Sequence, residues 1–157
     1  MIHHRIHLTD DQPVAIRAYK VRPELEKLMT QYVQELVDMG ACVPCNTSSY
    51  SAPLVMVPKP GTTELRVCVD YRRLNRKAKK FATNMVTADD IFDQLGDARI
   101  FSTLDLRKWF HQISVDPRDR HLLAFTTPHL GSFTWTALPM GFINSPFLAQ
   151  SCIEQVF

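Results

Sequence analysis

Long hydrophobic runs are missing from this 157-residue sequence. Its apolar stretches are only a few residues long, as in Leu54–Val57, whereas a membrane-spanning helix needs about 20 apolar residues. The opening segment, Met1–His7, lacks the apolar core of a secretory signal, and the four cysteines are too sparse for a disulfide scaffold in a chain of this length. We therefore expect an intracellular protein, cytoplasmic or nuclear, without a membrane segment.

Glycine-rich runs are also missing. The five glycines fall at expected helix ends, at turns or in a loop, and no two of them are close in sequence. A P-loop or a Rossmann dinucleotide site needs closely spaced glycines so that the backbone can approach phosphate groups. This absence excludes two large classes of nucleotide-binding protein.

The net charge of +2 conceals a local excess of positive charge. From residue 59 to residue 80 the chain carries eight basic and two acidic residues, so this region holds a charge of +6. The basic residues are Lys59, Arg66, Arg72, Arg73, Arg76, Lys77, Lys79 and Lys80. Such an excess suits a polyanion, either nucleic acid or nucleotide phosphate, and it is also typical of a solvated loop that keeps a protein soluble. Charge alone leaves both interpretations open.

Apolar periodicity predicts an α+β fold with an N-terminal extension over 1–22 and one domain over 23–157. Two β-patterned segments, Leu54–Val57 and Arg66–Asp70, surround a Pro/Gly turn and predict a hairpin. Helices are expected over Glu24–Met39, after the N-cap Thr87 and from Ser145–Pro146 onward. Further strands are expected at Ile100–Leu104, His111–Val115, Leu122–Thr126 and Ser132–Ala137.

Asp105 directly follows the expected buried strand Ile100–Leu104. A carboxylate at that point would be held on a rigid element, and Mg²⁺ prefers oxygen ligands presented in this way. The same residue type also caps turns through hydrogen bonds to the backbone. Asp105 is therefore a candidate metal ligand with a structural alternative.

The expected hairpin has Lys59 at its tip and Arg66 at the start of its return strand. Lysine contributes a mobile point charge, whereas arginine offers a planar fork for phosphate oxygens and a flat face that can lie over a base. Together the two side chains would clamp a triphosphate. The alternative is a pair of solvated hairpin charges.

A loop from Leu138 to Pro146 leads into the last expected helix. Gly141 permits close approach of a ligand to the backbone, and the helix start supplies oriented N–H groups. An ordinary strand-to-helix connection explains Ser145 and Pro146 but gives no reason for Pro139 and Gly141 together. We therefore keep this loop as a candidate ligand-binding segment.

These three clusters, in this order, resemble the reverse transcriptases of gypsy-type long-terminal-repeat retrotransposons and, more distantly, of retroviruses. The likeness covers nearly the whole chain. Its motifs are Tyr50–Lys59, Arg66–Asn75, Asp93–Gly96, Phe101–Arg107, and Leu138–Pro146 with Gln150. The resemblance implies a right-hand polymerase fold, fingers plus an incomplete palm. It also implies synthesis of DNA from deoxynucleoside triphosphates on a primed RNA or DNA template.

The resemblance also implies roles for individual residues. In this family two Mg²⁺ ions, held by carboxylates in the palm, activate the primer 3′-hydroxyl and neutralise the leaving pyrophosphate. Asp105 matches the first of those carboxylates, and the Leu106 carbonyl is an expected additional ligand. Lys59 matches the lysine on the triphosphate, and Arg66 matches the arginine over the incoming base and its phosphate.

Further contacts follow from the same resemblance. Phe110 falls where the family keeps an aromatic ring beneath the sugar, and such a ring would clash with a ribose 2′-hydroxyl. Gly141 and Gln150 match the block that lines the nucleotide and the template, and Arg72 lies where the fingers meet template phosphate. The residues expected to bind nucleic acid are Arg72, Arg73 and Arg76.

Two departures from the family pattern predict that this chain alone does not catalyse the reaction. The other two metal-binding carboxylates of the family lie in a Tyr-x-Asp-Asp hairpin, and this sequence reaches Phe157 without one. Lys108 and Trp109 replace the usual Ser-Gly, which puts an indole beside the nucleotide. The alternative function is a non-catalytic nucleic-acid-binding or interaction module, and a third possibility is a decayed or fragmentary element. Oligomeric state is not predicted.

Overall fold

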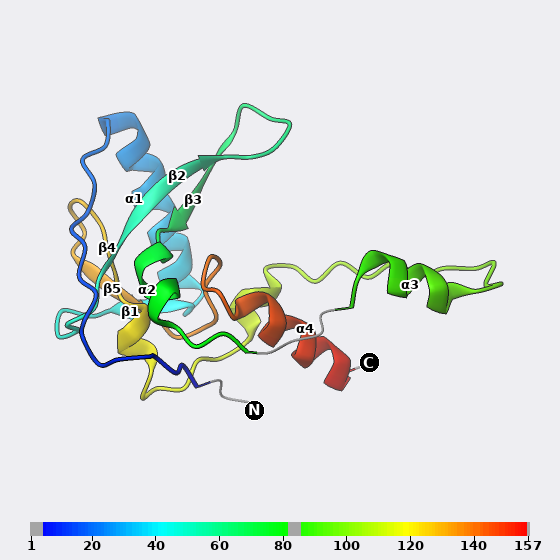
Figure 1. The fold of residues 1–157 in the computed structure, drawn as a ribbon. Coiled ribbons are helices and arrows are strands. Elements are labelled where there is room, and N and C mark those ends of the chain that lie inside the picture. Colours follow the sequence, from blue (N-terminus) through cyan, green and yellow to red (C-terminus); the bar gives the residue numbers. More distant parts are fainter. Residues whose placement is uncertain (1–4, 82–85, 157) are drawn as a thin grey trace.

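The computed structural model describes residues 5–81 and 86–156, which form a mixed α+β fold around one five-stranded sheet (Figure 1). The helices are α1 (Pro23–Asp38), α2 (Arg72–Lys77), α3 (Ala88–Leu95) and α4 (Ser145–Val156), with the 3₁₀ helices η1 (Trp109–Gln112) and η2 (Arg120–Leu123). The strands are β1 (Cys42–Pro44), β2 (Ala52–Pro58), β3 (Leu65–Val69), β4 (Phe125–Thr126) and β5 (Ser132–Trp135). Within the described residues, none of the helices has the length and apolar character needed to cross a membrane.

The sheet has the strand order β1-β5-β4-β2-β3 and is antiparallel except where β2 runs parallel to β4. Trp135 on β5 and Phe125 on β4 lie at its centre, with ring centroids 5.7 Å apart. Both side chains are fully enclosed, and Leu54 and Val69 extend the same core to the base of the β2–β3 pair. The core therefore joins strands from both halves of the chain.

The predicted hairpin is confirmed and extends beyond the rest of the sheet (Figure 1). Strands β2 and β3 pair from Leu54 opposite Val69 up to the tip, where the Lys59 amide donates to the Glu64 carbonyl at 2.9 Å. Gly61 takes the positive φ of +73° that the turn requires. Because burial decreases along both strands toward the turn, the tip of the hairpin faces solvent.

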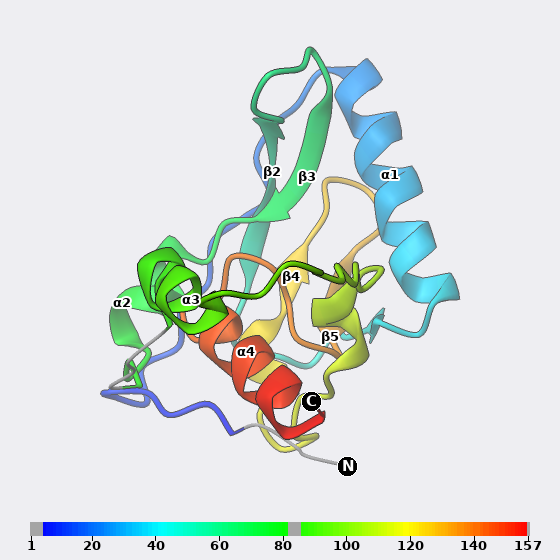
Figure 2. The same ribbon diagram turned by 90° about the vertical axis from the view of Figure 1, so that its right-hand side faces the viewer.

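Helix α1 confirms the predicted helix over Glu24–Met39 to within one residue at each end. Pro23 stands in the first turn, where its missing N–H costs no hydrogen bond. The helix lies beside the β2–β3 hairpin (Figure 2) and buries a stripe of three side chains. These are Met29, Val33 and Leu36. Burial of this stripe, at about 25 cal/mol per Å² of apolar surface, is the main force that holds α1 in place.

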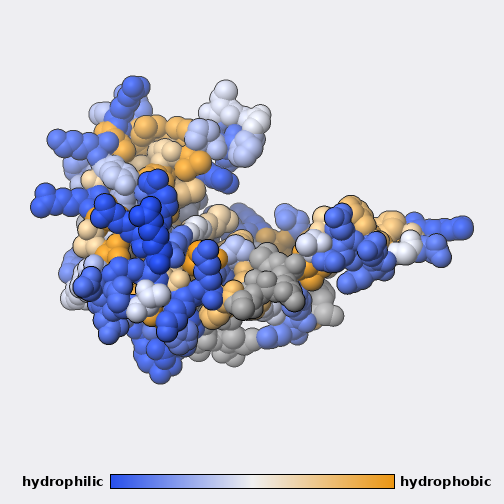
Figure 3. Space-filling view, viewed as in Figure 1, coloured by the Kyte–Doolittle hydropathy of each residue, from blue (hydrophilic) through white to orange (hydrophobic). Residues whose placement is uncertain are grey.

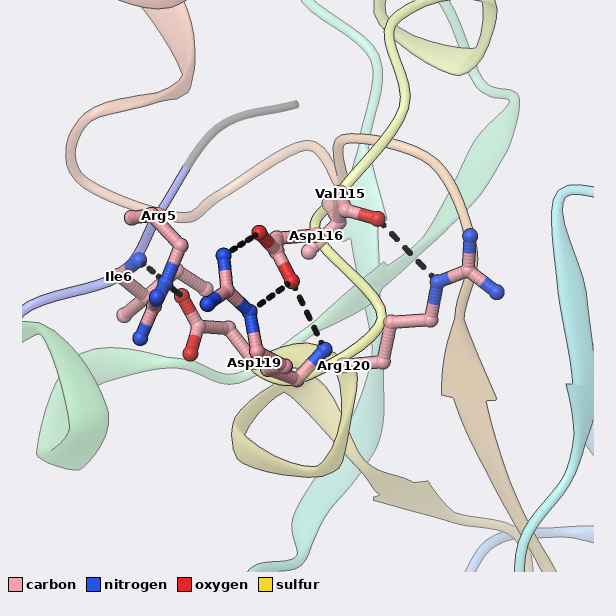
Figure 4. Close-up of polar contacts among 7 residues, drawn as sticks. Arg5, Ile6, Val115, Asp116, Asp119 and Arg120 are labelled. Carbon is pink, nitrogen blue, oxygen red and sulfur yellow. Dashed lines mark hydrogen bonds and ion pairs between the residues drawn. The ribbon is translucent and has the colours of Figure 1, made fainter. Parts of the chain in front are cut away.

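Residues 5–22, which we call the N-terminal strap, run along the body of the molecule and are tied to it at several points (Figure 1). Isolated bridges join Leu8 to Ala78 and Ala15 to Ser51. Figure 4 shows the start of the strap, where buried Asp119 accepts hydrogen bonds from Arg5 Nε and the Ile6 amide, both at 2.7 Å. The predicted N-terminal extension is thus fastened to the domain along its described length.

The helix predicted after Thr87 is confirmed as α3. It begins with a reciprocal capping box between Thr87 and Asp90. Together with the segment that follows, it forms the α3 arm (residues 86–106), which projects away from the body (Figure 1). The apolar side chains of α3 are solvent-facing, and Phe92 is 68% exposed. Figure 3 shows hydrophobic residues on the surface of this arm.

The predicted strand Ile100–Leu104 is wrong. Residues 98–106 have no regular secondary structure, and Ile100 and Leu104 are 90% and 71% exposed. A strand is stable only when a neighbour pairs with its backbone N–H and C=O groups, and no strand of the described residues pairs with this segment. The apolar run signals a tendency to form a strand, but the pairing partner decides whether the strand forms.

Two other predicted strands are replaced in large part by 3₁₀ helices. The segment His111–Val115 begins inside η1 and, in the described part of the chain, has isolated bridge positions at Ser114 and Val115, with Ser114 opposite Ala137. The segment Leu122–Thr126 begins in η2 and contributes only the two residues of β4. The expected last strand is confirmed as β5, and the helix expected at Ser145 is confirmed as α4.

Candidate nucleotide and nucleic-acid interface

The tip of the β2–β3 hairpin presents the two cations that the sequence singled out. Arg66 is on β3, where it pairs with Val57 of β2, and Lys59 directly follows the end of β2. Both side chains therefore lie on the exposed part of the hairpin. Lys59 Nζ is 2.5 Å from a carboxylate oxygen of Glu64, and this pair lowers the pKa of Glu64. Arg66 has no side-chain hydrogen bond or ion pair among the described residues. The guanidinium of Arg66 is therefore available to a ligand.

Directly after the hairpin, Asp70 holds the side chain of Arg72 in one position. The Asp70 carboxylate is 8% exposed and accepts hydrogen bonds from Arg72 Nε at 2.8 Å and Arg72 Nη2 at 2.7 Å. The hydroxyl of Tyr19, in the N-terminal strap, donates to the same carboxylate at 3.3 Å. The hydrogen bonds from Arg72 lower the pKa of Asp70 from 3.8 to about 2. Two guanidinium nitrogens of Arg72 are thus held by Asp70, while the side chain as a whole remains 80% exposed.

This lowered pKa predicts a pH-dependent contribution to stability. Because the pKa of Asp70 is depressed in the folded state, its contribution is complete above about pH 4 and is lost as the pH falls toward 2. We expect Asp70→Asn to lower the free energy of unfolding by about 1 kcal/mol at pH 7, a value reduced by the solvent around Arg72. Urea unfolding from pH 7 to pH 2 measures the difference between the two proteins.

The difference should shrink as the pH falls to 2, where about half of Asp70 is protonated in the folded parent, and it should disappear below that pH. Asp11→Asn, at an exposed position, is the matched control and should unfold like the parent at every pH. A difference between Asp70→Asn and the parent that stays constant down to pH 2 would contradict the assigned ion pair.

The loop around Gly141 is held against the base of the hairpin. Asn75, in α2, donates from Nδ2 to the Gly141 carbonyl at 2.8 Å and accepts from the Ile143 amide at 3.0 Å. Gly141 has a φ of +90°, and a Cβ atom there would lie 3.3 Å from the Val69 carbonyl oxygen. A glycine at this position therefore allows both the left-handed backbone conformation and the close approach of the loop to β3. In this way the structure brings the hairpin, α2 and the loop together.

Arg73 and Arg76 lie on the exposed surface of α2, next to Arg72. The structure thus groups the three arginines on one short helix that directly follows the hairpin. Figure 3 shows that hydrophilic residues dominate this part of the surface. The basic region of the sequence thus places two cations on the hairpin and three exposed arginines on the helix that follows it.

Asp105 is exposed and lies in the part of the α3 arm without secondary structure, next to half-buried Leu106. The expectation of a carboxylate held at the end of a buried strand is wrong for this structure, because that strand does not form. The described residues contain no group of three or more His, Cys, Asp or Glu side chains that could hold a metal ion. The donor set of Asp105 alone does not fit a magnesium site.

Phe110 lies in η1 and Gln150 in α4, two elements that contact each other. Phe110 is half-buried in η1, and the neighbouring Trp109 donates from its indole nitrogen to the Ala149 carbonyl of α4 at 3.2 Å. Gln150 Nε2 donates to Glu154 Oε1 at 2.8 Å, one turn further along the helix. The indole that replaces a glycine of the family is thus tied to α4.

Sequence reasoning did not assign the roles of Tyr19 and Asn75. The Asp-x-Arg spacing of Asp70 and Arg72 is a local signal that could have identified their ion pair, because a side chain can bond the backbone two residues on. No local signal connects Tyr19 to Asp70 or Asn75 to Gly141, since these contacts span 51 and 66 residues.

Comparison with known proteins identifies the class to which this fold and surface belong. The family model described as "Reverse transcriptase (RNA-dependent DNA polymerase)" matches residues 57–157. A crystal structure of the protease-reverse transcriptase of prototype foamy virus has a TM-score of 0.83 and 28% sequence identity, and the match covers 98% of this chain and 20% of the viral one. The right-hand polymerase fold implied by the sequence resemblance is confirmed.

The curated relatives are polyproteins of mobile elements and retroviruses. The Pol polyprotein of transposon 412 of Drosophila melanogaster is 37% identical over 161 residues, which covers 98% of this chain and 13% of the polyprotein. The Gag-Pol polyprotein of koala retrovirus is 31% identical over 153 residues, which covers 94% of this chain and 9% of that polyprotein. This chain belongs to the reverse transcriptase family and corresponds to a small part of its polyprotein relatives.

Proposed function

We propose that this chain supplies the nucleotide- and template-contacting surface of an RNA-directed DNA polymerase of a retroelement. The observation that carries the proposal is the exposed pair of Lys59 and Arg66 on a hairpin whose base is tied, through Asn75, to the Gly141 loop. A point charge and a planar fork on one rigid hairpin match the chemistry of a triphosphate. The family match supports the same reading.

The proposed ligand is a deoxynucleoside triphosphate beside a template-primer duplex. Lys59 exchanges its exposed partner Glu64 for phosphate oxygens, and Arg66 spans a phosphate and the face of the base. Phe110 lies under the sugar and excludes a 2′-hydroxyl. Gly141 and Gln150 border the nucleotide and the template. These roles follow from the family resemblance, and the exposure of Lys59, Arg66 and Gly141 supports them.

We further propose that the chain by itself does not catalyse nucleotide addition. Reverse transcriptases use divalent metal ions held by several carboxylates, and the described residues offer no such cluster. Asp105 is a single exposed carboxylate on an irregular segment. The sequence contains no Tyr-x-Asp-Asp motif that would supply the others.

Two measurements test the proposal. Primer extension with Mg²⁺, a primed RNA template and deoxynucleoside triphosphates should give no incorporation above background, with the chain and its Asp105→Ala variant indistinguishable. Incorporation that is lost in Asp105→Ala would overturn the claim of inactivity. Binding of a fluorescent deoxynucleoside triphosphate should weaken about tenfold or more when Lys59 and Arg66 are both replaced by alanine, whereas Lys27→Ala on α1 should bind normally.

A second candidate function is a non-catalytic module that binds nucleic acid. The observation that favours it is the surface of α2, where Arg73 and Arg76 are exposed beside the fixed Arg72. Binding of an oligonucleotide without any measurable binding of deoxynucleoside triphosphate would select this function over the first.

A further inference from the structure

The α3 arm exposes an unusual share of the apolar side chains of this protein. Of the fifteen large apolar side chains that are exposed among the described residues, seven lie on this short arm. They are Val86, Ile91, Phe92, Leu95, Ile100, Phe101 and Leu104. Because soluble proteins seldom leave so many neighbouring apolar groups in water, such a surface marks a site of interaction with another molecule.

Helix α3 separates its apolar residues from its acidic ones. The 3.6-residue period of the helix places Ile91, Phe92 and Leu95 on one side, with Asp89 and Asp93 on the side next to it. The whole arm has five acidic residues and one basic residue, a charge of −4. Since the net charge of the chain is +2, the rest of the chain carries +6. The complement of this arm is therefore an apolar surface with a basic rim.

A hollow of this character, which we call the base hollow, lies where the arm joins the body. It has a volume of about 400 Å³ and is lined by Met39, Ala41, Arg107, Lys108, His111 and Gln112. Burial lowers the pKa of His111, so its ring is uncharged at neutral pH and adds to the apolar lining. Both ring nitrogens lack a hydrogen-bond partner among the described residues. The base hollow thus combines apolar groups with the charges of Arg107 and Lys108.

We propose that two copies of this chain associate about a two-fold axis, with helix α3 of each copy bound in the base hollow of the other. The arm projects away from the body (Figure 1), and the base hollow begins at Arg107, directly after the arm. When two copies lie in opposite directions, each arm therefore extends toward the base of the other. The same contact then forms twice, and the assembly closes at two copies.

The side chains of the two surfaces suit each other. In this arrangement the ring of Phe92 enters the base hollow and packs against Met39, which is 45% exposed in the single chain. Asp93, on the neighbouring side of the helix, meets Arg107 and Lys108 at the rim. The charges steer the two copies into one orientation, and the apolar groups supply most of the binding free energy.

The size of the contact predicts weak association. Phe92 and Phe101 are 68% and 60% exposed, and each offers on the order of 100 Å² of apolar surface. With the other apolar side chains of the arm and the two-fold repetition, the contact reaches on the order of 1,000 Å², the lower limit for a specific interface. We expect a dissociation constant on the order of 10 µM, so that the chain is monomeric at about 1 µM with its arm exposed.

The first test is sedimentation velocity of the full chain from about 1 µM to about 200 µM. The parent should change from monomer to dimer over this range. Phe92→Ser should raise the dissociation constant about tenfold or more, because it removes the aromatic group at the centre of each contact. Leu130→Ser is the matched control, since Leu130 is 44% exposed and lies outside both the arm and the base hollow. The control should associate like the parent.

The second test reverses the charges on the two surfaces. Arg107→Glu/Lys108→Glu places like charges opposite the arm and should raise the dissociation constant about tenfold or more, as should Asp89→Lys/Asp93→Lys. A chain with all four substitutions restores opposite charges across the contact, so its dissociation constant should return to within about threefold of the parent value. Damage to the fold in either double variant would not be repaired in this way.

Each outcome supports or overturns the dimer. A parent chain that stays monomeric at every concentration overturns it, and growth beyond two copies overturns the closed two-fold arrangement. Association of Phe92→Ser at the strength of the parent, or a fourfold variant that stays as weak as the double variants, overturns the contact between arm and base hollow. Lys20→Glu/Lys27→Glu changes the same charge at exposed positions elsewhere and should associate like the parent. None of these results depends on the binding of nucleotide or nucleic acid.

Discussion

Replacing Trp135 by alanine is expected to lower the free energy of unfolding by about 3 to 5 kcal/mol. The indole is 1% exposed and lies 5.3 Å from the ring of His111 and 5.7 Å from that of Phe125. Its removal costs the hydrophobic transfer energy of the ring and leaves a cavity that β5, pairing on both sides, cannot collapse to fill. Since domains of this kind are stable by about 5–15 kcal/mol, the variant loses a large share of its stability.

Urea unfolding followed by circular dichroism measures this loss. Phe92→Ala is the matched control, because this aromatic side chain is 68% exposed on the α3 arm. The control should stay within about 0.5 kcal/mol of the parent. A similar loss in both variants would mean that the arm is packed in solution and that its exposure here is wrong.

Replacing Gly141 by valine is the change with the second largest expected effect, a loss of about 2 to 4 kcal/mol. The positive φ of +90° costs about 1–2 kcal/mol for a residue with a side chain, and more for a β-branched one. In addition, the new Cβ atom would lie 3.3 Å from the Val69 carbonyl oxygen, so the loop or β3 must move. That movement strains the two hydrogen bonds that Asn75 makes with the loop, one as donor to Gly141 and one as acceptor from Ile143.

Gly61→Val provides the control for this prediction. Gly61 has a φ of +73°, but a Cβ atom there meets nothing within 4 Å. Gly61→Val should therefore have only the conformational cost, and its loss in free energy of unfolding should be smaller than that of Gly141→Val by about 1 kcal/mol or more. Thermal unfolding compares the two variants, and equal losses would contradict the close approach of the loop to β3.

Elements whose signals are local were predictable from the sequence. Helix α1 has an apolar stripe and a proline at its start, the β2–β3 hairpin surrounds a Pro/Gly turn, and α3 begins with a Thr-x-x-Asp capping box. Each of these signals lies within a few residues of the element that it predicts. The family could be predicted for the same reason, because its motifs are short segments in a characteristic order.

The sequence identified the candidate site residues, but it did not predict most of the contacts that bring them together. Lys59 and Arg66 share the hairpin as expected, because a turn of known kind connects their strands. The contact between Asn75 and Gly141, and the hydroxyl of Tyr19 on Asp70, join segments that are far apart in the chain. For Asp105 the prediction was wrong, because the strand expected before it needs a pairing partner and no strand of the described residues pairs with that segment.

By itself the sequence determined helices α1, α3 and α4, the hairpin, the clustering of basic residues from 59 to 80 and the family, since all of these depend on neighbours along the chain. Only the tertiary structure decided that residues 98–106 stay unpaired, that Gly141 is held against β3, and that Arg73 and Arg76 border two hollows beside the N-terminal strap. The physical reason is that pairing, burial and charge compensation depend on groups brought together from distant parts of the chain.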